Sequence, residues 1–79
     1  MNCDQQEHKR FLEEQLEWCR KEDRILETIE VKLHKMKELA EFACFYELTA
    51  IETDMLNGQL DELRKEVQYL EQQLYSVSH

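Results

Sequence analysis

The 79-residue chain contains no proline and a single glycine, Gly58. Turns between strands and long loops depend on these two residue types, so the sequence leaves room for few turns. Glu, Gln, Leu and Lys dominate instead, and their side chains lose little rotamer freedom in a helix. The composition therefore predicts an all-α protein made of long helices.

The chain also lacks any run of about 18 apolar residues, so no membrane contact is predicted. Its first fifteen residues carry four acidic side chains and no apolar core, which argues against a secretory signal peptide. The sequence thus predicts a cytoplasmic protein. In that reducing compartment the three cysteines remain thiols; they are Cys3, Cys19 and Cys44.

Motifs that carry chemistry are missing as well. There is no Cys-x-x-Cys pair and no glycine-rich phosphate loop, and His8, His34 and His79 are scattered along the chain. Glu30 precedes His34 by four residues, whereas carboxylate-bridged metal bundles use Glu-x-x-His. The sequence predicts a protein that is not an enzyme and has no cofactor and no metal site.

The net charge of −8 is unevenly distributed. Residues 38–79 hold nine acidic and two basic side chains, whereas residues 1–37 hold nine and eight. An acidic half repels phosphate backbones, so nucleic acid is not an expected partner. The one basic cluster is interpreted as a solvated helix face; it consists of Lys32, His34, Lys35 and Lys37.

Apolar residues recur every three or four positions, which is the period of a helix. Asp4 and Glu7 resemble a capping box, and helix is predicted from about Asp4 to Tyr75. A single unit over 1–79 is expected, with an amphipathic helical region at 4–56 and a heptad segment at 57–77. The main stripe comprises Leu12, Leu16, Cys19, Leu26, Ile29, Leu33, Met36, Ala40, Cys44, Leu48, Ile51 and Met55.

The C-terminal third has a strict heptad of leucine and valine, typical of a coiled coil. It predicts a homo-oligomer, with a dimer favoured and with oligomer order and helix direction left open. The predicted oligomer interface is Leu56, Leu60, Leu63, Val67, Leu70, Leu74 and Val77.

Asn57-Gly58 is the strongest helix breaker, since both residues tolerate the left-handed conformation that ends helices. The sequence is compatible with a helical hairpin that turns there, or with one nearly continuous helix in which the heptad runs through Gly58. The charged run from Arg20 to Arg24 is a weaker candidate for a turn.

Residues 39–51 are apolar on nearly all sides of the expected helix, which is usual when several helices meet. Glu47 lies among these apolar residues and is interpreted either as a solvated side chain or as a polar group that fixes helix register. The candidate residues of a helix junction or a partner interface are Trp18, Phe42, Phe45, Tyr46 and Glu47.

These features predict an oligomerisation or protein-interaction module, with a protein partner of unknown identity. The alternative is an acidic regulator that covers a basic surface of another protein.

Overall fold

The computed structural model describes the backbone of residues 2–77 and the side chains of residues 4–76. It contains two α-helices, α1 (Asn2–Phe45) and α2 (Ala50–Val77). No β-strand occurs within the described range. The predicted all-α fold is confirmed, and the predicted helix from Asp4 to Tyr75 is interrupted only by residues 46–49.

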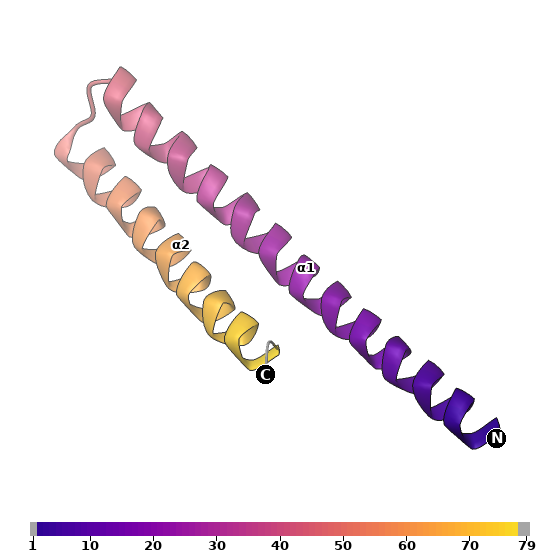
Figure 1. Ribbon diagram of the computed structural model, residues 1–79. Helices are drawn as coiled ribbons and strands as arrows, with labels where there is room; N and C mark the ends of the chain where they lie inside the picture. Colours follow the sequence, from indigo (N-terminus) through magenta and orange to yellow (C-terminus); the bar gives the residue numbers. More distant parts are fainter. Residues whose placement is uncertain (1, 78–79) are drawn as a thin grey trace.

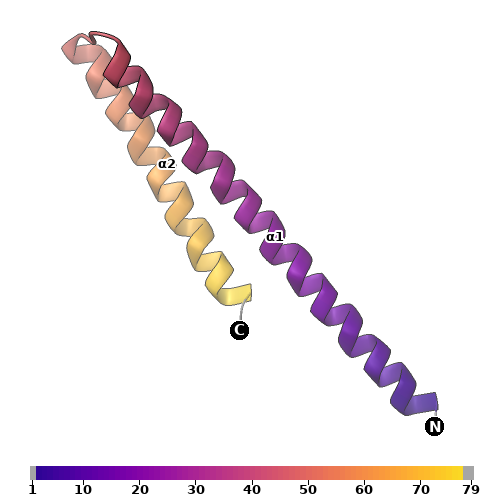
Figure 2. The ribbon, with the colours of Figure 1, turned by 45° about the horizontal axis from the view of Figure 1, so that its top comes forward.

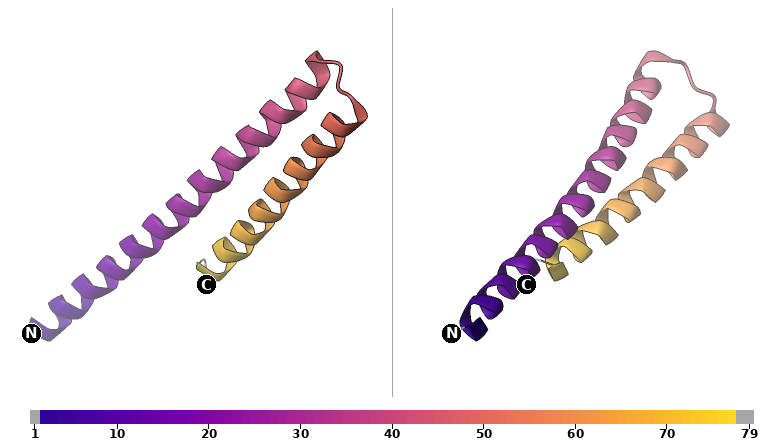
Figure 3. Two further views of the ribbon diagram at one scale, coloured as in Figure 1. Left: turned by 180° about the vertical axis from the view of Figure 1, so that it is seen from behind. Right: turned by 90° about the vertical axis from the view of Figure 1, so that its right-hand side faces the viewer.

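The helices run antiparallel and side by side as a hairpin of unequal arms (Figure 1). Both further orientations show the same long, thin shape (Figures 2 and 3). The molecule extends 72 × 18 × 11 Å, and its radius of gyration is 20.1 Å. A compact globule of this length would have a radius of gyration of about 12 Å. The hairpin is therefore a rod with little interior.

One seam between the two helices holds the least exposed side chains. Among the described side chains only Ile29 and Val67 are buried, with 9% and 7% of their surface exposed. The half-buried and buried positions of both arms repeat at steps of three and four, which is the spacing of coiled-coil packing. On α1 they are Gln15 and, from one heptad further on, Glu22, Ile25, Ile29, Lys32, Met36 and Leu39. On α2 they are Leu56, Leu60, Leu63, Val67, Leu70 and Leu74.

The chain turns at residues 46–49, so the predicted turn sites were wrong. Asn57-Gly58 lies inside α2, and the Arg20–Arg24 run lies inside α1. A capping box fixes the start of α2. The Thr49 N–H donates to Glu52 Oε1 (3.2 Å), and the Glu52 N–H donates to Thr49 Oγ1 (3.1 Å). Two backbone donors at the helix start are thereby satisfied.

We expect Gly58→Ala to stabilise the hairpin by about 1 kcal/mol, because alanine is the better helix former. No atom lies within 4 Å of a Cβ built at Gly58, and its φ is not positive. Thermal unfolding at fixed protein concentration measures the change. A loss of stability would instead place a left-handed turn at Asn57-Gly58.

We expect Thr49→Ala to lower the free energy of unfolding by about 1 kcal/mol, because it removes the capping oxygen. Thr53→Ala is the matched control, since Thr53 is an exposed threonine one turn further into α2. Urea unfolding of both variants measures the difference. Equal effects of the two substitutions would show that the capping box does not hold the turn.

Candidate interaction surface

The apolar stripe predicted on the first helix divides between two faces of α1. Ile29 and Met36 lie in the seam. Five other apolar residues of the predicted stripe remain exposed and form a second line along α1. We call this line the outer strip; it consists of Leu12, Leu16, Cys19, Leu26 and Leu33.

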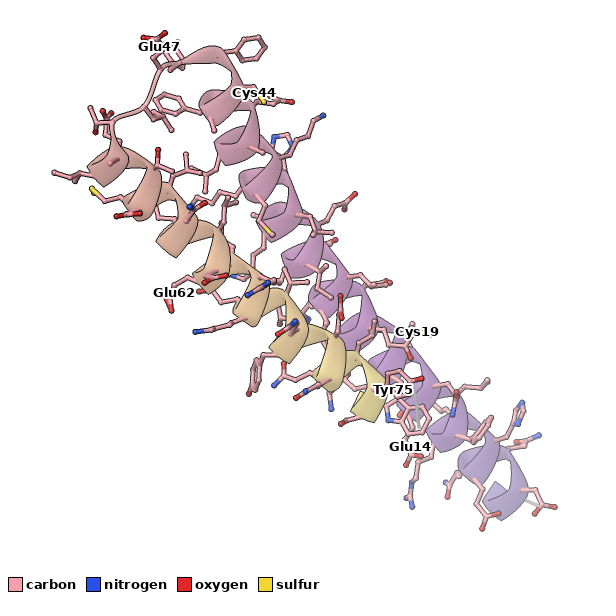
Figure 4. The ribbon with its side chains drawn as sticks, turned by 90° about the vertical axis from the view of Figure 1, so that its left-hand side faces the viewer. Glu14, Cys19, Cys44, Glu47, Glu62 and Tyr75 are labelled. Carbon is pink, nitrogen blue, oxygen red and sulfur yellow. The ribbon has the colours of Figure 1, made fainter. Side chains whose placement is uncertain are left out.

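The N-terminal part of α1 extends past the end of α2 (Figure 1). Lys21 and Arg24 line a hollow together with Gln73 and Ser76, close to the end of α2. Figure 4 likewise places Tyr75 beside the stretch of α1 that carries Glu14 and Cys19. Residues 2–13 therefore lie past the end of α2, whereas residues 14–20 lie level with its last side chains. We call residues 2–20 together the overhang, and it is about 28 Å long at 1.5 Å per residue.

This overhang carries large apolar side chains that remain about half exposed. Phe11 and Leu12 expose 55% and 53% of their surface, and Leu16 exposes 51%. Trp18 exposes 42%. Scattered exposed leucines are normal, but a cluster of this kind marks a contact surface.

The C-terminal heptad packs within the chain. Its described residues, from Leu56 to Leu74, face α1 of the same molecule, whereas the sequence assigned them to contacts between chains. Their contacts with a second chain stay a prediction. Val77 ends α2, and its side chain lies outside the described part of the structure.

The predicted helix junction lies at the tip of the hairpin. Phe42 and Tyr46 stack with ring centroids 4.6 Å apart, and Phe45 exposes 78% of its surface. Glu47 is exposed in the turn (Figure 4). Trp18 lies on the same helix about 36 Å from Phe42, so Trp18 does not contact these aromatics within one chain.

Lys32 is a residue whose role the sequence did not reveal. It occupies a seam position between Ile29 and Met36, and its Nζ donates to Glu66 Oε2 at 2.9 Å. The Lys32 side chain is 28% exposed. A polar residue at a core position favours the register in which it finds its partner. The sequence feature that could have revealed this role is the three-and-four spacing of residues 25, 29, 32, 36 and 39, which includes Lys32.

Replacing Lys32 with leucine should stabilise the hairpin by about 1 kcal/mol, since an apolar side chain gains burial in the seam. Glu66 is 48% exposed and stays solvated without its partner. Lys37→Leu is the control, because the Lys37 side chain is 71% exposed. Chemical denaturation compares the two variants. A strong destabilisation by Lys32→Leu alone would mean that the ion pair holds the arms together.

The remaining charged side chains do not converge on a site. His34 pairs with Glu38 at 3.0 Å and Lys37 with Glu41 at 3.8 Å, both along one helix face. Within the described residues no three His, Cys, Asp or Glu side chains are placed to hold a metal ion. Neither described helix is long and apolar enough to cross a membrane.

Comparison of the chain with protein-family models, with curated proteins and with solved structures finds no match. The surface of the hairpin is therefore the basis for assigning a function.

Proposed function

We propose that the protein is a small interaction module that associates with itself, as a dimer in the first instance, and has no catalytic activity. The observation that carries this proposal is the apolar surface of α1 outside the seam, above all on the overhang. A two-helix hairpin without disulfides or metal is too small to gain much stability from its own core. Association with a second chain buries apolar surface that the hairpin alone leaves exposed.

The surface area supports this proposal. A folded monomer of 9.7 kDa exposes about 5,100 Å², whereas this chain exposes 6955 Å². The excess of roughly 1,800 Å² exceeds the approximately 800 Å² that each partner buries in a standard interface. One chain thus has enough uncovered surface for a stable, extensive dimer.

The pattern on α1 supports it too. A helix that contacts one neighbour needs two apolar positions per heptad, and a helix in a bundle uses a third. The α2 arm has the first pattern, since its exposed flanks are mainly polar. The α1 arm has the second, because the outer strip runs beside the seam positions. The long arm is therefore the one that contacts a partner.

The alternative proposal is an acidic regulator in the cytoplasm that covers a basic protein surface. Residues 38–79 carry nine acidic side chains and only two basic ones, and those described on α2 are exposed. Electrostatic capture weakens as salt rises, whereas apolar self-association does not. Binding to a basic peptide at two salt concentrations separates the two proposals.

Leu16→Glu should weaken self-association at least tenfold, because it places a charge in an apolar contact. Gln6→Glu is the matched control, since it adds the same charge at an exposed polar position of the overhang. Sedimentation equilibrium over a concentration series gives the dissociation constants, and circular dichroism checks that helicity is kept. A wild-type chain that stays monomeric throughout that series would refute the proposal.

A further inference from the structure

We infer that the partner is a second copy of this chain, bound antiparallel through the outer strip, so that each overhang becomes the third helix of the partner's hairpin. This inference rests on the proposed self-association and adds its geometry. The contact joins α1 to α1, with both α2 arms on the outside.

The spacing of the outer strip sets the register. Leu12, Cys19, Leu26 and Leu33 follow one another at intervals of seven, so they form one line along a supercoiled helix. A two-fold axis at Cys19 brings Leu12 against the partner's Leu26, and the reverse contact follows from symmetry. Leu12 and Leu26 then meet on both sides of the axis, while Leu33 comes opposite the partner's Gln5.

Charges at the edge of the strip favour this register. Lys9 lies one turn before Leu12, and Glu30 lies one turn before Leu33. With the axis at Cys19, Lys9 comes beside the partner's Glu30, and a second such pair forms by symmetry. Asp23 comes beside the partner's Leu16, so no like charges meet there.

Two other arrangements bring like charges together. A shift of the axis to between Glu22 and Asp23 sets Lys9 beside the partner's Lys37 and the two copies of Asp23 against each other. A parallel dimer sets every charge, including Lys9 and Glu30, against its own copy. Like charges that face each other oppose association, so the antiparallel register at Cys19 is preferred over these two arrangements.

The length of the overhang fits the same arrangement. Residues 2–20 lie along residues 18–36 of the partner's α1, a stretch whose seam side is already covered by the partner's α2. Each half of the dimer then contains three helices. Three helices can enclose a core where two cannot, and the overhang supplies Phe11, Leu12, Leu16 and Trp18 to it.

Cross-linking between two single-cysteine variants tests this geometry. The background carries Cys3→Ser, Cys19→Ser and Cys44→Ser, and one sample adds Lys9→Cys while the other adds Glu30→Cys. A short bis-maleimide is the probe. We expect cross-linked dimer when the two samples are mixed, and at least tenfold less in either sample alone.

The outcomes separate this inference from the proposed function. Cross-linking within each separate sample would show a parallel dimer and overturn the inference. A dimer in sedimentation that gives no mixed cross-link would also overturn it, while self-association would stand. A monomer in both wild type and background would refute both.

Charge exchange in the wild-type background gives an independent measurement. Lys9→Glu should weaken dimerisation several-fold at low salt, because two attractive pairs become repulsive. Adding Glu30→Lys to that variant should restore the wild-type dissociation constant. If the double variant stays as weak as the single one, Lys9 and Glu30 do not meet and the antiparallel register is wrong.

Discussion

Two helices side by side share only one face, and the rest of this structure depends on that constraint. The seam between α1 and α2 takes one line of side chains from each arm, and only Ile29 and Val67 in it become buried. The other described apolar residues of the seam are only half-buried, and those outside the seam are mostly exposed. The unequal arms increase this exposure, because most of the overhang extends past the end of α2. An apolar strip outside the seam is the direct result.

The position of the seam on α1 explains which parts of the fold could be predicted from the sequence and which could not. The apolar spacing correctly indicated long helices, and the α2 side of the seam followed from its unbroken Leu/Val heptad. The α1 side did not, since Glu22 and Lys32 occupy seam positions. The predicted stripe contained only apolar residues at helical spacing, so it omitted the two charged seam positions and included apolar residues of the neighbouring line. It therefore combined residues of the seam with residues of the outer strip.

The turn was missed for a related reason. Glycine and asparagine mark most turns, and the sequence offers them at Asn57-Gly58. The chain instead turns without any positive φ in its described part, and Thr49 with Glu52 caps the next helix. The Thr-x-x-Glu motif was visible in the sequence but lay within an apolar stretch that favoured a continuous helix. The sequence named Phe42, Phe45, Tyr46 and Glu47 as candidates, and the structure places them at the tip. The overhang became apparent only once the turn was known.

The turn also orders the events of folding. Contacts across the seam close loops whose length grows with distance from the tip. Leu39 and Leu63 line one hollow near the tip, and Arg24 and Gln73 line another near the end of α2. Shorter loops lose less chain entropy on closure and form contacts faster. We therefore expect the first contacts between the arms to form next to the capped turn. Further contacts then form in order along the seam towards the C-terminus. The overhang takes no part in that process, so the apolar surface it carries stays open until the hairpin is complete.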